Sequence, residues 1–104
     1  MTNSEIEALK AEIRSFAQAR DWEQFHVPKN LAMAITGEAG ELAAEFQWLT
    51  EKESSLEGLS AEKLDAIALE VADIQIYLLR LADVLNIDVA EVVRKKMEIN
   101  QKRF

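Results

Sequence analysis

Two pairs of acidic residues are the clearest chemical feature of the sequence. Glu38 and Glu41 form the first pair, and Glu70 and Asp73 form the second. Side chains three residues apart in an α-helix lie on the same side, about one turn apart. If both segments are helical, each helix presents two carboxylates together.

Both pairs lie on the apolar side of their expected helices. Counting about 100° per residue places Leu31, Ala34, Ile35 and Leu42 within about 60° of Glu38. The same count places Ala66, Ile67, Ile74, Tyr77 and Leu81 around Glu70. A soluble helix normally carries Leu or Ile at the centre of such a stripe. A single surface Glu is common, but two matched pairs on apolar midlines indicate a function.

Four carboxylates that meet between two helices repel one another, and burial disfavours their charged forms. They must either take up protons or bind a cation, and carboxylate oxygens suit Mg²⁺ or Mn²⁺ better than zinc or copper. Carboxylate-held Mg²⁺ typically takes further ligands from water and substrate phosphates. The four acids are therefore the predicted metal-binding and catalytic residues, with hydrolysis of a phosphoanhydride as the expected reaction. Glu45, near the same midline, is either a further ligand or a solvated acid at the edge.

Composition limits the remaining possibilities. The chain has 104 residues, a net charge of −7, three Gly, one Pro and no Cys. We expect one helical domain over residues 1–104, no binding to a nucleic-acid polymer, and no disulfide, iron–sulfur cluster or thiolate zinc site. No apolar run approaches the length of a membrane span, and the first residues lack the pattern of a signal sequence. We therefore expect a cytoplasmic protein without membrane contact.

Apolar periodicity predicts an all-α, four-helix-bundle-like fold, with helices at about residues 3–20, 30–49, 61–85 and 88–103. A capping box at Thr2 or Ser4 opens the first helix, and Asn30, Ser60 and Asp88 are the predicted N-caps of the others. The connections allow the second and third helices to pack antiparallel, which would bring the two acid pairs face to face. The third helix is apolar on nearly every side, so we expect contacts with another subunit.

Aromatic residues could supply flat surfaces for a nucleotide base. Trp22, Phe25, Trp48 and Tyr77 are the candidates, with His26 as a hydrogen-bonding group. Taken singly, each aromatic residue is more often part of a core. Lys96 and Asn100 share one face of the last helix and could contact phosphate, although cations in the last turns of a helix are also common without a ligand.

Taken in order, these residues resemble the MazG-like, all-α nucleoside triphosphate pyrophosphohydrolases. Four stretches resemble more narrowly the dCTP pyrophosphatase branch: Arg20–Leu31, Gly37–Leu42, Phe46–Trp48 and Lys96–Asn100. The resemblance implies Mg²⁺-dependent hydrolysis of a (deoxy)nucleoside triphosphate, dCTP or a related dNTP, to the monophosphate and pyrophosphate. It also implies a homotetramer built from two tight dimers, with each site lined partly by neighbouring subunits.

The resemblance also assigns roles to individual residues. Glu38, Glu41, Glu70 and Asp73 would bind the metal. The nucleoside would be held by Trp22, Glu23, Gln24, Phe25 and His26 together with Trp48 and Tyr77, and the phosphates would meet Lys96 and Asn100.

One position departs from the family pattern. Many MazG relatives carry two adjacent acids at the start of the first motif, whereas Gly37 precedes Glu38 here. This leaves the number of metal ions and the role of Glu45 open. Two alternatives remain: a relative that acts on another nucleotide, such as dUTP or phosphoribosyl-ATP, and a non-catalytic helical oligomerisation or regulatory module.

Overall fold

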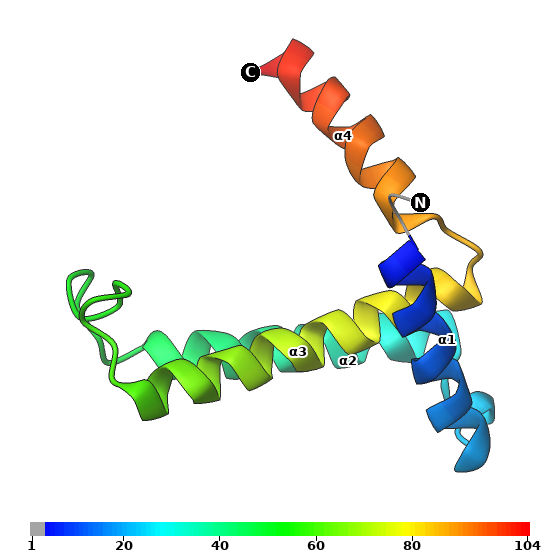
Figure 1. Ribbon diagram of the computed structural model, residues 1–104, viewed down its shortest axis with the longest axis horizontal. Helices are drawn as coiled ribbons and strands as arrows, with labels where there is room; N and C mark the ends of the chain where they lie inside the picture. Colours follow the sequence, from blue (N-terminus) through cyan, green and yellow to red (C-terminus); the bar gives the residue numbers. More distant parts are fainter. Residues whose placement is uncertain (1–3) are drawn as a thin grey trace.

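The computed structural model describes residues 4–104 and shows an all-α chain (Figure 1). Its elements are α1 (Ser4–Ala19), the short 3₁₀ helix η1 (Glu23–Phe25), α2 (Pro28–Phe46), α3 (Ala61–Val84) and α4 (Val89–Arg103). Across these described residues no strand is formed. The predicted all-α class and its four helices are confirmed. No helix in this part of the chain has the length and apolar character needed to cross a membrane.

Two of the predicted N-caps are confirmed. The Ser60 hydroxyl accepts a hydrogen bond of 3.1 Å from the backbone N–H of Lys63. The Asp88 carboxylate accepts one of 3.1 Å from the backbone N–H of Glu91. Each bond satisfies an N–H group that the first turn of a helix leaves without a partner. The capping residue predicted at Thr2 lies outside the described residues.

The prediction for the second helix was wrong at both ends. Its N-cap is Val27, with φ −78° and ψ 150°, and not Asn30. Proline suits the first helical position because its φ is already helical and its missing N–H is not needed there, so Pro28 starts the helix. The Asn30 amide instead donates a 3.2 Å hydrogen bond to the Phe25 carbonyl, which ties η1 to α2. At the other end α2 stops at Phe46 rather than near residue 49.

The helix that follows the polar connection lies beside the one that precedes it. α2 and α3 run antiparallel along their length, and α1 packs across the C-terminal part of α3 (Figure 1). The buried apolar residues are Ala17, Leu31, Ile67, Leu79 and Ala82. α4 extends away from the other helices, and Val92, Val93, Met97 and Ile99 on it are exposed. Three helices of the predicted bundle therefore pack within one chain, while α4 leaves most of its apolar residues exposed.

Two tight turns set the directions of the chain after α1 and α3. Asp21 and Asn86 each have a φ of 56°, in the left-handed region. After α1, the N–H of Trp22 donates to the Ala17 carbonyl at 2.9 Å, and that of Asp21 donates to the Gln18 carbonyl at 3.1 Å. This is the Schellman pattern of a helix C-terminus. It turns the chain sharply and places Trp22 back against α1.

Candidate functional site

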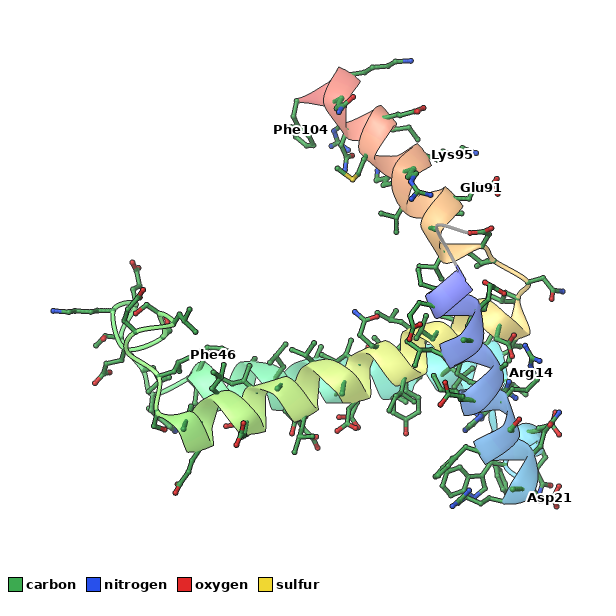
Figure 2. All side chains as sticks on the ribbon, in the orientation of Figure 1. Arg14, Asp21, Phe46, Glu91, Lys95 and Phe104 are labelled. Carbon is green, nitrogen blue, oxygen red and sulfur yellow. The ribbon has the colours of Figure 1, made fainter. Side chains whose placement is uncertain are left out.

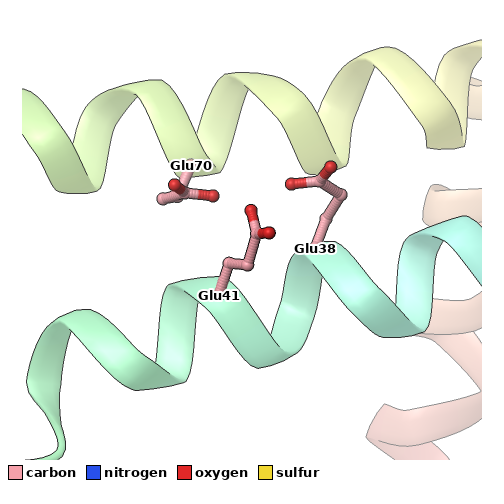
Figure 3. A group of neighbouring side chains, drawn as sticks. All are labelled: Glu38, Glu41 and Glu70. Atoms are coloured by element: carbon pink, nitrogen blue, oxygen red, sulfur yellow. The ribbon is translucent and has the colours of Figure 1, made fainter.

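The structure brings three of the four predicted acids together between α2 and α3. Figure 3 shows Glu38 and Glu41 projecting from α2 towards Glu70 on α3. One carboxylate oxygen from each of the three lies within 4.8 Å of the others. We call these residues the acid centre. Asp73 is exposed and lies outside this close group, although its charge acts on both Glu38 and Glu70.

The acid centre has negative charge that the protein does not match. Glu38 Oε2 and Glu70 Oε2 are buried and have no hydrogen-bond partner. Burial raises the pKa of the Glu38 carboxyl, and the charges of Glu41 and Asp73 raise it further. Burial likewise raises the pKa of Glu70, with the same two neighbours adding to the effect. Buried carboxylate oxygens in this situation require a proton or a cation, and oxygen ligands of this kind suit Mg²⁺ or Mn²⁺.

Glu45 differs from the acid centre because it has a partner. Its Oε1 lies 3.1 Å from Lys63 Nζ, in an ion pair that joins α2 to α3. Glu45 is still close enough for its charge to contribute to the raised pKa of Glu70. Its carboxylate is therefore already neutralised within the chain.

A cavity of about 340 Å³ lies at the N-terminal end of α2. Its lining comes from the segment after α1, from the start of α2 and from α3: Trp22, Phe25, His26, Asn30, Leu31, Ala34 and Tyr77. We call it the aromatic cavity. Four residues predicted to hold a nucleoside, namely Trp22, Phe25, His26 and Tyr77, thus meet in one place. The volume and the mixture of aromatic and polar groups are typical of a small-molecule site.

A second, smaller cavity is lined by both aromatic residues and acids. It measures about 160 Å³ and shares Trp22, His26 and Tyr77 with the aromatic cavity. Glu38 and Asp73 also line it. Aromatic residues of the first cavity and two of the predicted acids therefore line one and the same cavity.

The other predicted nucleoside contacts do not line the aromatic cavity. Glu23 and Gln24 are exposed on η1, and the Gln24 amide donates to the Asp21 carbonyl at 3.2 Å. Trp48 follows α2 at the end opposite the cavity, and it is 86% exposed. Trp48 follows Phe46 closely in the chain, and Trp22 follows Asp21. Figure 2 shows Phe46 at one end of the α2–α3 pair and Asp21 near the other end.

The predicted phosphate contacts also lie apart from the acid centre. Lys96 and Asn100 are on α4, which extends away from α2 and α3 (Figure 1). A single chain therefore supplies the acids and the aromatic cavity, but not these two groups.

The structure adds site residues that the sequence did not reveal. Asn30 and Ala34 line the aromatic cavity. Arg80 is 5% exposed, and its Nε donates a hydrogen bond of 3.1 Å to His26 Nδ1. A signal for Arg80 existed, because it is a cation within an apolar run and lies about two helical turns after Asp73. Its partner His26 is distant in sequence, so no local pattern could name it.

Comparison with known proteins agrees with these observations. Residues 33–104 match the MazG-like family. The chain is 45% identical over 103 residues to the protein named dCTP pyrophosphatase 1 from Homo sapiens and 43% identical to that from Bos taurus. In both cases the match covers 99% of this chain but 59% of the mammalian protein, so the chain spans well under two thirds of those relatives.

A solved structure extends the agreement to the fold. The crystal structure of a pyrophosphatase from Archaeoglobus fulgidus DSM 4304 superposes with a TM-score of 0.87 at 38% sequence identity, covering 96% of this chain and 92% of that one. The resemblance predicted from the acid pairs and the aromatic segment is thus confirmed, and the chain belongs to the MazG-like family.

Proposed function

We propose that the protein hydrolyses a (deoxy)nucleoside triphosphate, dCTP or a related dNTP, to the monophosphate and pyrophosphate. The observation that carries this proposal is the pair of buried oxygens without partners, Glu38 Oε2 and Glu70 Oε2, next to a cavity lined by aromatic residues. The names of the relatives agree, since they are dCTP pyrophosphatase 1 in two mammals and a pyrophosphatase in an archaeon.

In this proposal Glu38, Glu41 and Glu70 hold Mg²⁺, with Asp73 as the fourth ligand residue and Mn²⁺ as a substitute ion. The close approach of three carboxylates supports the choice of a hard divalent cation. When bound, Mg²⁺ supplies polarisation of a phosphoryl oxygen and activation of the attacking water. The acids would in this way also help to position the triphosphate, since carboxylate-held Mg²⁺ typically takes further ligands from substrate phosphates.

The aromatic cavity would hold the nucleoside. Trp22, Phe25 and Tyr77 offer ring faces, and His26 offers a polar group towards the base edge. The small cavity that links these residues to Glu38 and Asp73 supports an orientation with the phosphates towards the acids. Glu23 and Gln24 stay predicted contacts at the outer edge of the site.

We further propose a homotetramer of two tight dimers, in which neighbouring subunits complete each site. The exposed apolar residues of α4 support this, since an exposed apolar surface of this kind normally marks an interaction site.

Gly37 and Gly40 on α2 give a second argument for this assembly. Each costs a helix about 1 kcal/mol relative to Ala, yet a Cβ at either position would meet no atom within 4 Å. A partner helix passing close to this side of α2 would explain both. Trp48, Lys96 and Asn100 would then reach the nucleotide of a neighbouring subunit.

The assembly can be tested separately from catalysis by sedimentation. In the single chain a larger side chain at Gly40 enters open space, so Gly40→Leu should fold normally and even gain helix propensity. We expect it to shift the protein from tetramer to smaller species. Ala39→Leu serves as the control, because Ala39 is exposed on the same helix but points about 100° away from Gly40. A wild-type monomer at micromolar concentration would overturn the proposed assembly.

The activity is tested by pyrophosphate release across a panel of dNTPs and NTPs, with Mg²⁺ and with EDTA. We expect metal-dependent release of pyrophosphate and monophosphate, fastest with dCTP, and none from Glu38→Gln. Release that favours another nucleotide, such as dUTP, would keep the chemistry and change the substrate. No release from any nucleotide by folded protein would leave the alternative of a helical oligomerisation module, which the exposed face of α4 favours. The cytoplasmic location expected from the sequence stays a prediction.

A further inference from the structure

A buried arginine contacts the histidine of the aromatic cavity. Arg80, on α3, donates from Nε to His26 Nδ1 at 3.1 Å and from Nη1 to Asp83 Oδ2 at 3.1 Å. Only 5% of Arg80 is exposed. Its guanidinium is therefore held on two sides by fixed partners and is not a mobile surface group.

Asp83 is itself held by a second arginine. Arg14, on α1, donates from Nε to Asp83 Oδ2 at 2.8 Å and from Nη2 to Asp83 Oδ1 at 2.7 Å. This bidentate geometry fixes orientation as well as distance. A hydrogen-bonded series thus runs from Arg14 through Asp83 and Arg80 to His26, and it joins α1 and α3 to the segment before α2.

The chemistry of the two side chains determines where the histidine proton lies. A guanidinium has only N–H donors, so the ring nitrogen that faces Arg80 must be an unprotonated acceptor. A neutral imidazole then carries its proton on the other nitrogen, Nε2. Among the described residues no protein group hydrogen-bonds to Nε2. His26 lines both the aromatic cavity and the smaller cavity that Glu38 and Asp73 also line.

We propose that Arg80 is a positioning residue that fixes His26 as the neutral tautomer with its proton on Nε2, so that the aromatic cavity presents a hydrogen-bond donor to the ligand. The site would then favour a base whose facing edge carries an acceptor, either a carbonyl oxygen or an unprotonated ring nitrogen. This specificity rests on the proposed function, because it takes the base to occupy the aromatic cavity. The assignment of the histidine tautomer does not depend on the proposed function.

The surroundings of His26 agree with a neutral ring. Burial lowers its pKa, and the charge of Arg80 lowers it further. The other titratable groups that line the same cavities are Tyr77 and Asp73 from α3 and Glu38 from α2, while α1 contributes only apolar residues there. Protonation of Nδ1 would break the bond from Arg80 and leave two cations side by side.

The first test measures the tautomer directly in the intact, nucleotide-free protein. His26 is the single histidine of the sequence, so a long-range ¹H–¹⁵N correlation spectrum shows one imidazole. We expect the shift of an unprotonated Nδ1 and of a protonated Nε2, with a titration midpoint below that of an ordinary histidine. In Arg80→Met the midpoint should rise and the two nitrogen shifts should move towards each other. A proton on Nδ1 in the wild type, or an unchanged spectrum in Arg80→Met, would overturn the proposal.

Lys10 provides a matched control for the loss of a buried cation. It is 4% exposed, lies on α1, and donates from Nζ to the Ile87 carbonyl at 2.9 Å and to Glu7 Oε2 at 3.2 Å. Lys10→Met should leave the His26 shifts and midpoint unchanged. If both variants change the histidine spectrum equally, Arg80 acts only through general packing and the proposal fails.

The second test measures specificity in the holoenzyme with Mg²⁺. Arg80→Met should raise KM for the preferred dNTP by about tenfold, the effect expected for loss of one hydrogen bond, while kcat changes by less than about twofold. For an analogue in which the base acceptor is replaced by C–H, KM should be the same in both proteins. Equal effects on both substrates would overturn the specificity role. Absence of hydrolysis in the wild type would instead overturn the proposed function and leave the spectroscopic result standing.

Discussion

Helix α3 carries two ionisable groups in opposite situations. Glu70 has a buried oxygen with no partner and lies beside two further acids. Arg80, on the same helix, donates to an acid on one side and to a histidine on the other. The protein thus gives the cation two hydrogen-bond acceptors and leaves an oxygen of the anion without a partner. Since unmatched buried charge is costly, the acid centre is built for a ligand, whereas the arginine network is built to position its neighbours.

Removing one acid from the unmatched group should have the largest effect on function. We expect Glu38→Gln to lower kcat/KM for the preferred dNTP by more than about 1,000-fold, because loss of metal-assisted stabilisation is worth several kcal/mol. Its fold should persist, since the change relieves repulsion between carboxylates. Pyrophosphate release and circular dichroism measure the two properties. Glu62→Gln, an exposed acid in the first turn of α3, is the control and should retain activity. Wild-type turnover in Glu38→Gln would show that the acid centre is not built for a catalytic cation.

Removing Asp83, the acid that holds Arg80 and Arg14, should instead reduce the stability of the fold. Asp83→Asn leaves the buried Arg80 without its counter-charge, so we expect a loss of about 3 kcal/mol in the free energy of unfolding near neutral pH. The hydrogen bond from Arg14 holds the pKa of Asp83 below its ordinary value. Its contribution is therefore present above the ordinary pKa of about 3.9 and is lost as pH falls through the lower, folded-state value.

Urea unfolding of both proteins between pH 7 and pH 3 checks this prediction. The difference between wild type and Asp83→Asn should narrow at the acid end, as wild-type Asp83 takes up its proton. A constant difference across this range would show that the charge of Asp83 does not stabilise the fold.

The acid centre could be predicted from sequence. Helical periodicity alone places Glu38 and Glu41 on one face of the second helix and Glu70 on the apolar face of the third. The aromatic segment was also predictable as a group, although the outward position of Trp48 was not. The hydrogen-bonded series from Arg14 to His26 could not be predicted in this way. The contact between His26 and Arg80 depends on where α1 and the segment before α2 cross α3, and packing between distant segments sets that position. The position of Val27 as N-cap could have been predicted in place of Asn30, since Pro28 favours the first helical position.

Metal binding should reverse the stability order of the acid centre. With EDTA, we expect Glu70→Gln to unfold at a higher temperature than wild type, because a buried charge without a partner is removed. With Mg²⁺ at about 100 times its dissociation constant, wild type should gain about 2.7 kcal/mol, and the variant should gain much less. Thermal melts of both proteins under the two conditions give the comparison. Equal melting temperatures of wild type with Mg²⁺ and with EDTA would contradict cation binding at these acids.

The smallest expected effect separates Glu45 from the acid centre. Lys63 already neutralises Glu45 at 3.1 Å, and both side chains are partly exposed. We therefore expect Glu45→Gln to change stability by less than about 1 kcal/mol. It should weaken Mg²⁺ binding only slightly, through the loss of a remote charge, whereas Glu41→Gln should weaken it strongly by removing a ligand. Calorimetric titration with Mg²⁺ measures both affinities. If the two variants lose affinity equally, Glu45 is a ligand that Lys63 releases when the cation binds. The acid centre would then extend by one further turn of α2, to Glu45.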